Sequence, residues 1–465
     1  MIERNNAAGA GKLISVVMAC CGTALAACDS GQVNETSQDQ PKQGNVAPLE
    51  IAPERKAPDA TIGQRYNEQI RNIAENAKVQ AAMEQIESRA EAARRLLIEL
   101  TEIPAPPFHE EDRARRFADI MREIGLEEVI IDEVGNVIGR RPGEIGKKRI
   151  VISAHLDTVF PPGTDVTVRK EGNRLYAPGI ADDTRGLVAV LEVVRAIVDS
   201  NIKTEADLLF VGTVGEEGLG DLRGVKHLFR ESGQRIDAFM SLEPSAVSSI
   251  THAGVGSHRY RVTYEGPGGH SWHAFGLANP HHALGRAIAE FDKTAPAVSA
   301  TEVKTSYNVG RIGGGTSVNS IPFESWMEVD MRSSRESKIE EMDAVFQSAI
   351  QTALAAENAG RAEGSPLTMD VEMVGDRPAG DIDPETPLVQ RAMAAVTYLG
   401  FSPELRASST DSNVPISMGI PAVTIGAGGK GENFHAPEEW WEDVDSHLGP
   451  QNALLILLAS AGLRN

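Results

Sequence analysis

Residues 150–157 read IVISAHLD, and this stretch decides the fold. Its apolar, β-branched first half predicts a strand that is buried on both faces. The strand ends at His155 and Asp157. Ligands of open α/β sheets collect just outside the carboxyl ends of the strands. His155 is therefore placed to offer its imidazole to a metal ion, with Asp157 supporting the ring from behind.

Apolar segments that alternate with helical patterns predict the rest of this sheet. We expect strands at residues 150–154, 208–211, 238–242 and 422–425, and helices at 184–200 and 224–232. Such alternation is typical of a doubly wound α/β sheet. The sequence thus predicts a mixed sheet at the core of a catalytic domain.

A different pattern begins near residue 257 and ends before the strand at 422. Its expected elements are a strand at 259–264, a helix at 280–293, strands at 305–312 and 325–332, a helix at 338–358 and a strand at 367–374. This β-α-β-β-α-β order is that of a ferredoxin-like α+β domain. We therefore predict that residues 256–377 are inserted into a catalytic domain formed by residues 61–255 and 378–465.

The first 60 residues predict export and attachment to a membrane. Arg4 and Lys12 precede an apolar segment at 13–27, which is shorter than the ~20 residues that span a bilayer. Residues 25–28 read LAAC and resemble a bacterial lipobox, in which Cys28 becomes lipidated. We expect a lipoprotein signal peptide at 1–28, a flexible linker at 29–60 and a lipid-anchored protein facing a Gram-negative periplasm. A plain signal peptide is the alternative.

Composition narrows the classes of partner. The chain of 465 residues carries 45 Lys+Arg against 66 Asp+Glu, a formal net charge of −21. Such a field repels polyphosphates, so nucleic-acid binding is disfavoured. Removal of the signal peptide leaves Cys28 as the one cysteine, which excludes a disulfide within the mature chain.

Further acidic residues and a histidine fall where the predicted strands end or helices begin. They are Asp182, Asp183, Glu216, Glu217, Glu243 and His435. Taken singly, each is explained as a helix cap or a solvated loop residue. Together with His155 they form a mixed histidine and carboxylate set without cysteine. Such a set suits two divalent ions, most simply zinc, that share one bridging carboxylate.

Three short segments in this order, HLD at 155–157, APGIADD at 177–183 and EEG at 216–218, resemble the motifs of the M20 metallopeptidases. That family includes zinc-dependent aminoacylases, carboxypeptidases and di- and tripeptidases. The resemblance extends from about residue 96 to the end of the chain and implies two Zn²⁺ per chain, with Co²⁺ or Mn²⁺ as substitutes.

The resemblance also assigns roles to the candidate residues. It implies that Asp182 bridges both metals, that Glu217 and His435 complete one site, and that His155 and Glu243 complete the other. Asp157 would orient His155. Glu216 would be the general base that takes a proton from a metal-activated water.

The inserted domain carries further matches to the family. The segment GPGGHS at 266–271 resembles the lid, whose histidine, here His270, commonly reaches the active site of the other subunit. A homodimer with a lid/dimerisation domain is therefore expected. Asn319 and Arg332 would hold the backbone or carboxylate of the substrate. A hairpin-turn role for His270 and a strand-end salt bridge for Arg332 are the plain alternatives.

Two departures leave the substrate class open. Thr184-Arg185 replaces the family's usual lysine, and Glu243 stands where aminopeptidases of the family carry Asp. Glu243 favours the acylase branch, whereas residues 103–107 and 409–411 resemble the tripeptidase branch. We expect a hydrolase of peptide or amide bonds in short peptides or N-acyl amino acids. The alternatives are a non-catalytic peptide-binding lipoprotein and a hydrolase of a non-peptide amide or carbamoyl compound.

Overall fold

The computed structural model describes residues 61–233 and 235–464. The predicted signal peptide, Cys28 and the linker at 29–60 lie outside the described residues. Among the helices of the described part, none combines the length and the apolar character that crossing a membrane requires.

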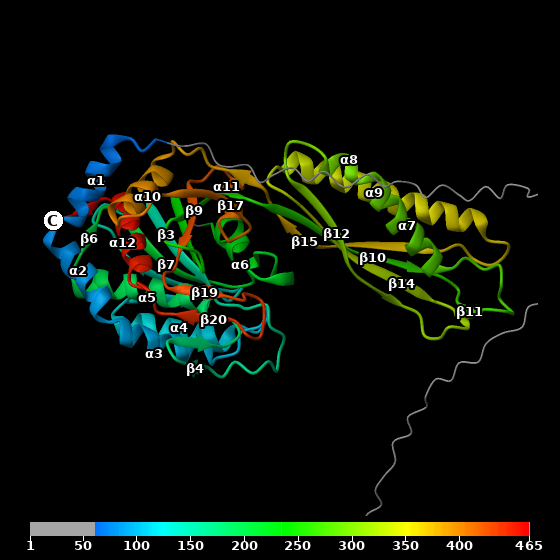
Figure 1. The fold of residues 1–465 in the computed structure, drawn as a ribbon, viewed down its shortest axis with the longest axis horizontal. Helices are drawn as coiled ribbons and strands as arrows, with labels where there is room; N and C mark the ends of the chain where they lie inside the picture. Colours follow the sequence, from blue (N-terminus) through cyan, green and yellow to red (C-terminus); the bar gives the residue numbers. More distant parts are fainter. Residues whose placement is uncertain (1–60, 234, 465) are drawn as a thin grey trace, which may run out of the picture. The chain divides into compact units, whose positions relative to one another are not determined.

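The first part of the described chain and its last part contribute strands to one mixed nine-stranded sheet (Figure 1). Its order is β1-β2-β7-β3-β8-β18-β9-β16, and β17 pairs with β9. Strands β7, β3, β8 and β18 run parallel to their neighbours in this series, as the alternating pattern predicted. The doubly wound fold class is confirmed. The strands are β1 (Glu128–Ile131), β2 (Val137–Arg141), β3 (Arg149–His155), β7 (Asp207–Thr213), β8 (Ala238–Glu243), β9 (Ser249–Gly254), β16 (Gly380–Asp381), β17 (Glu404–Ser408) and β18 (Ala422–Gly426).

Helices cover this sheet because their apolar faces require burial. Helix α5 is apolar nearly all round and packs against β3, β7 and β8, while α12 contacts β3 and β18. The first described residues form three helices, α1 to α3, and Asn76 caps the second. The helices are α1 (Gln64–Ala74), α2 (Ala77–Ser88), α3 (Ala90–Thr101), α4 (Glu111–Ile124), α5 (Thr184–Asp199), α6 (Arg223–Lys226), α10 (Pro387–Tyr398), α11 (Asn413–Ser417) and α12 (Leu448–Ala461).

Four short strands that the sequence pattern did not reveal form a small antiparallel sheet of order β19-β20-β5-β4. It joins the segment before α5 to the segment before α12. Two further short strands, β6 (Lys203–Thr204) and β21 (Leu463–Arg464), pair with each other. The small sheet consists of β4 (Arg169–Glu171), β5 (Arg174–Tyr176), β19 (Lys430–Glu432) and β20 (Trp440–Glu442).

A four-stranded antiparallel sheet of order β12-β14-β10-β15, the second sheet, lies between β9 and β16 in the chain. Helices α7 and α9 cover one of its faces (Figure 1). The order β10-α7-β12-β14-α9-β15 is the predicted ferredoxin-like order. The elements are β10 (Gly256–Glu265), β11 (Gly269–His270), α7 (Pro280–Thr294), α8 (Pro296–Ser299), β12 (Thr305–Gly314), β13 (Ser320–Ile321), β14 (Glu324–Ser333), α9 (Glu336–Gly360) and β15 (Thr368–Arg377).

Alternation along β14 separates the two faces of the second sheet. Met327, Val329 and Met331 are buried in a hydrophobic cluster with α7 and α9. The residues between them, Glu328 and Asp330, therefore lie on the opposite face, which we call the open face. The hydrophobic core of the main sheet and that of the second sheet are separate clusters. The exact domain bounds stay predictions.

Candidate metal centre and active-site cavity

The carboxyl ends of adjacent parallel strands bring the predicted metal ligands together. His155 ends β3 and Glu243 ends β8, while Glu217 follows β7 in a tight loop. Asp182 directly precedes Asp183, the residue that caps α5 by accepting a hydrogen bond from the backbone of Gly186. The remaining ligand, His435, lies between β19 and β20.

Asp182 lies between the two histidines. Its Oδ1 is 3.0 Å from His155 Nε2, and its Oδ2 is 3.2 Å from His435 Nε2. His435 Nε2 is also 3.0 Å from Glu217 Oε1, and His155 Nε2 is 4.0 Å from Glu243 Oε2. The sets His155–Asp182–Glu243 and Asp182–Glu217–His435 each hold donor atoms within 4.8 Å of one another. One Asp182 oxygen belongs to each histidine, as a bridging carboxylate requires.

Asp157 supports the centre through the backbone. His155 Nδ1 donates to the carbonyl oxygen of Asp157 at 2.9 Å. The Asp157 carboxylate accepts hydrogen bonds from the backbone N–H groups of Glu216 at 3.0 Å and Glu217 at 2.8 Å. Its carboxylate thus holds the loop that carries both glutamates, and its carbonyl orients the His155 ring.

The electrostatics of this group fit divalent cations. Burial raises the pKa of Glu243 well above its ordinary value, and the charge of Asp183 adds to this. Burial also disfavours ionised Asp182, but hydrogen bonds with His155 and His435 hold the pKa of Asp182 below its ordinary value. Hydrogen bonds to Asp182 and Glu217 raise the pKa of His435 to about 10. Several carboxylates buried together require positive charge nearby. Their oxygens and the imidazole nitrogens are ligand types that zinc binds.

Comparison with known proteins agrees with this geometry. The model of the peptidase family M20/M25/M40 matches residues 151–458. The chain belongs to this family. It is a metallopeptidase or amidohydrolase, as the three motifs predicted.

Other proteins of known sequence or structure are similar to this M20 enzyme over most of its length. The uncharacterized protein YqjE of Bacillus subtilis is 26% identical over 359 residues, 74% of this chain and 91% of YqjE. The aminopeptidase PepT of Bacillus cereus superposes with a TM-score of 0.63 at 23% identity, covering 80% of this chain and 98% of that one. The YXEP protein of Bacillus subtilis gives 0.58 at 16%, covering 81% and 99%.

Glu439 is a site residue of this M20 enzyme that sequence reasoning missed. Its buried carboxylate accepts backbone hydrogen bonds from Ala181 at 2.8 Å, Asp182 at 2.9 Å and Gly179 at 3.1 Å. Burial raises its pKa to about 7. Glu439 therefore holds the loop that presents Asp182. An acid placed directly before the apolar pair Trp440-Trp441 was the available signal.

Arg185, at the position where the family usually has lysine, is not part of the metal group. Its Nη1 lies 2.7 Å from Glu192 Oε2, and its Nη2 donates to the Ser446 carbonyl at 2.9 Å. The buried guanidinium thus links α5 to the start of α12. Its role is to fix this helix pair.

A cavity of about 690 Å³ connects the metal group to the second sheet. Arg332 lines it, whereas His270 and Asn319 do not. Instead, the backbone N–H of Ser271, next to His270, donates to the Asn319 carbonyl at 2.9 Å, beside the short β11–β13 pair. The cavity also holds residues that the sequence reasoning did not select: Arg259, Asn308, Arg311, Glu328, Asp330 and Arg377.

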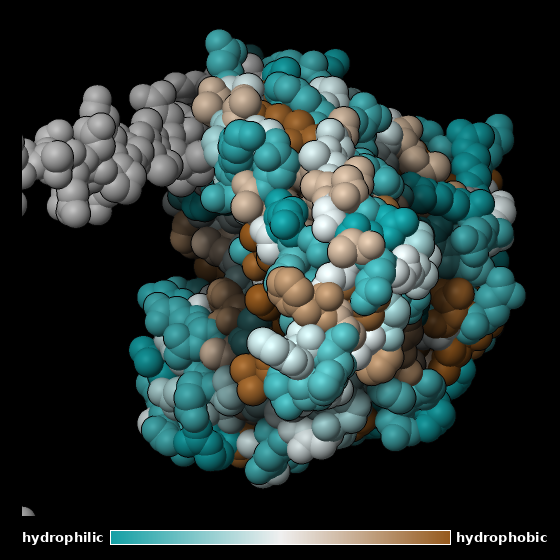
Figure 2. All heavy atoms as spheres, turned by 90° about the vertical axis from the view of Figure 1, so that its right-hand side faces the viewer, coloured by the Kyte–Doolittle hydropathy of each residue, from teal (hydrophilic) through white to brown (hydrophobic). Residues whose placement is uncertain are grey.

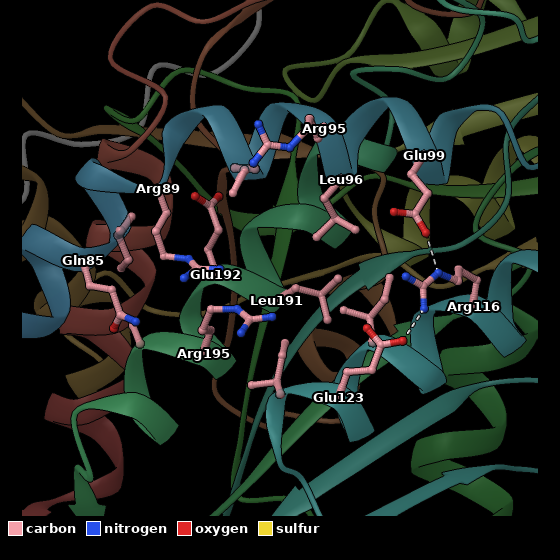
Figure 3. Close-up of a pocket in the computed structure, with 16 residues that line it drawn as sticks. Gln85, Arg89, Arg95, Leu96, Glu99, Arg116, Glu123, Leu191, Glu192 and Arg195 are labelled. Carbon is pink, nitrogen blue, oxygen red and sulfur yellow. Dashed lines mark hydrogen bonds and ion pairs between the residues drawn. The ribbon is translucent and has the colours of Figure 1, made fainter.

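A smaller cavity of about 240 Å³ lies among α2, α3, α4 and α5 (Figure 3). Arg116 pairs there with Glu99 and Glu123 over an apolar floor that includes Leu96 and Leu191. It contains none of the candidate metal ligands. The larger cavity is therefore the candidate active site.

Proposed function

We propose that this M20 enzyme hydrolyses a peptide or amide bond in short peptides or N-acyl amino acids, with two divalent cations, most simply zinc. The observation that carries the proposal is Asp182, whose two oxygens face His155 and His435. The descriptions of PepT as an aminopeptidase and of YXEP as a dinuclear metal binding peptidase support it.

The chain supplies both ligand sets and a base. His155 and Glu243 would complete one cation site around Asp182, and Glu217 with His435 the other. Cations bound there would make water nucleophilic near neutral pH and polarise the scissile carbonyl. The protein's own residues must then position the substrate and move the proton.

Glu216 is the residue that can move this proton. Burial raises its pKa to about 8, although the charge of Arg377, whose Nη1 lies 3.1 Å from Glu216 Oε1, opposes the shift. A carboxylate with a raised pKa accepts a proton from water and, once protonated, can deliver it to the leaving amine. Asp157 fixes the backbone of Glu216 and so its position in the cavity.

The Glu216→Gln variant tests the proposal. It is expected to retain the metal content of the wild type and to lose about 10²–10⁴-fold in turnover, since general-base catalysis typically supplies that factor. Glu217→Gln should lose both metal and turnover, and the exposed Glu133→Gln should lose neither. Elemental analysis and a panel of peptides, N-acyl amino acids and carbamoyl compounds, with and without chelator, give the readouts.

The outcomes separate the alternatives. Unchanged turnover in Glu216→Gln would remove this residue as the base. Chelator-sensitive cleavage of carbamoyl compounds alone would favour the non-peptide hydrolase. Absence of turnover on every substrate in metal-replete wild type would favour a peptide-binding protein of the same fold.

We also propose that two copies of the chain associate through the second sheet, so that His270 of one reaches the cavity of the other. In its own chain His270 does not line the cavity. Large apolar side chains near it and near Asn319 are exposed, among them Trp272 (82%), Phe275 (86%) and Val318 (103%). Figure 2 views the molecule from the side that lies to the right in Figure 1 and shows hydrophobic side chains there among hydrophilic ones.

Mixing two inactive variants tests this association. His270→Ala and Asp182→Asn should each lose activity, and mixed dimers should regain it, because one cavity then has intact ligands and an intact partner histidine. Light scattering and differently tagged chains would verify the mixed dimers. If verified mixed dimers stayed inactive, His270 would act within its own chain or not at all.

A further inference from the structure

Two arginines share one carboxylate on the open face of the second sheet. Arg259 Nε donates to Asp330 Oδ1 at 2.8 Å, and Arg332 Nε donates to Asp330 Oδ2 at 2.7 Å. All three residues line the cavity of the metal group. One negative charge thus faces two positive charges, and the group keeps a net charge of +1.

The same arrangement is repeated next to it. Arg261 Nη1 and Arg311 Nη1 each lie 2.8 Å from a different oxygen of Glu328. Their guanidinium carbons stack over the Trp326 ring, 4.0 and 5.5 Å from its centre. This group also has a net charge of +1, and the Arg311 side chain is 66% exposed at the cavity. The aromatic face restricts where the two guanidinium groups can lie.

The position of Arg311 depends on a β-bulge. Strict alternation along β12 from Asn308, which pairs with Asp330, would put Gly310 on the open face and turn Arg311 toward the helices. A register shift between Val309 and Arg311 instead makes Arg311 the partner of Glu328. Bulges commonly re-aim a side chain beside an active site. Here the bulge directs a second arginine onto Glu328.

A purely structural role does not account for this surface. One arginine per carboxylate would neutralise Asp330 and Glu328, whereas each of them meets two, and Glu328 meets one from each of the strands that flank β14. The chain as a whole has a net charge of −21, so the excess of arginine at this cavity runs against its composition. Because Glu328 and Asp330 are two residues apart on one strand, the backbone positions at the centres of the two groups lie about 7 Å apart.

We propose that the open face selects substrates whose leaving residue carries two anionic groups, namely N-acyl or peptidyl aspartate or glutamate. The inference rests on the proposed hydrolytic function and names its substrate class. The group of Arg259, Arg332 and Asp330 takes the α-carboxylate. The group of Arg261, Arg311 and Glu328 takes the side-chain carboxylate, since guanidinium groups bind carboxylates through paired hydrogen bonds.

Substrates that differ by one charge at nearly constant shape test the inference. Zinc-loaded Glu216→Gln protein is titrated calorimetrically with N-acetylglutamate, N-acetylglutamine and N-acetylleucine, and kcat/KM is measured on the wild type with the same compounds. N-acetylglutamate is expected to be favoured over N-acetylglutamine by about tenfold or more, because a charge-assisted contact replaces a neutral one. Arg311→Gln should bring this ratio close to one.

Arg286→Gln is the matched control. Arg286 lies on α7 and pairs with Glu357 on the helix-covered side of the second sheet, and its side chain is half exposed. The control should keep the wild-type preference for N-acetylglutamate. Loss of the preference in the control as well would show that any change of charge alters it, and would overturn the assignment to Arg311.

The outcomes distinguish this inference from the proposed function. Equal or tighter binding of N-acetylglutamine overturns the inference, and so does a preference that survives in both Arg261→Gln and Arg311→Gln. Preferential binding of N-acetylglutamate without hydrolysis of any compound would support the inference while rejecting the hydrolase. Hydrolysis of all three compounds at similar rates would do the reverse.

Discussion

The candidate active-site cavity lies between two differently built walls. The metal wall holds the proposed ligands around Asp182, and the arginine wall is the open face with Arg259, Arg311 and Arg332. On the metal side, buried carboxylates are held by backbone N–H groups, as Asp157 and Glu439 show. On the open face of the second sheet, part-exposed arginines are held by shared carboxylates such as Asp330. Backbone contacts fix ligand positions tightly, whereas long side chains retain rotamer freedom. We infer that the metal wall serves the reaction and the arginine wall serves the choice of substrate.

The walls meet at the proposed base. Arg377, the last residue of β15, donates to the Glu216 carboxylate and to the Ser409 hydroxyl, each at 3.1 Å. Arg259 donates to the carbonyl of Gly218 at 2.7 Å. These contacts tie the arginine wall to the loop that carries Glu216. The position of the second sheet is therefore coupled through Arg377 to that of the proposed general base.

Glu439→Gln should weaken the metal wall without replacing any of the proposed metal ligands. An amide cannot accept three backbone hydrogen bonds as the carboxylate does, and its NH₂ group would face a backbone N–H. The loop presenting Asp182 should loosen, and metal affinity should fall about 10–100-fold, as is typical when a group that supports a ligand is lost. Competition with a chromophoric chelator measures the affinity.

The neighbouring Glu438→Gln is the control for this prediction. Glu438 is exposed and pairs with Arg169 on the protein surface at 2.8 Å. It should leave metal affinity at the wild-type value. Equal losses in both variants would indicate a general charge effect, and no loss in Glu439→Gln would show that Asp182 is positioned without this contact.

The sequence could propose a joint location for several of the metal-wall residues because they stand at strand ends or in short motifs. His155 and Glu243 stand at the ends of apolar segments, and Asp182 and Glu217 lie in short contiguous motifs. Local pattern is sufficient where a strand end determines the location of a side chain. The fold class was predictable for the same reason, since long apolar runs and helical periodicity mark the main sheet.

The site residues that the sequence analysis did not select depend on contacts that a local sequence pattern does not encode. Glu439 meets Asp182 across 257 positions of the chain, through short strands with little hydrophobic periodicity. On the arginine wall only Arg332 was predicted, because it lies in a family motif. Arg311 reaches the open face through a bulge that simple alternation contradicts.

The response to pH should sharpen the contrast between the walls. The proposed metal centre is expected to lose affinity as pH falls, because its ligands would bind cations in their deprotonated forms. The second sheet contains a link with the opposite dependence. His258, on β10, faces three acids: Asp343 at 3.5 Å, Asp376 at 3.8 Å and Glu336 at 3.9 Å. The contact with Asp343 is the main cause that raises the pKa of His258 above its ordinary value.

A histidine with a raised pKa in the folded state stabilises the fold fully below its unfolded pKa of about 6.5. This contribution is lost as pH rises through the folded pKa. His258→Gln should therefore reduce the free energy of unfolding by about 1.5 kcal/mol at pH 5.5, and by much less at pH 9. Urea unfolding of metal-free protein at both pH values measures the difference, with the exposed His282→Gln of α7 as control. An equal destabilisation at both pH values would mean that His258 contributes through packing and not through its charge. The second sheet would then have no His258-dependent stability that is lost as pH rises.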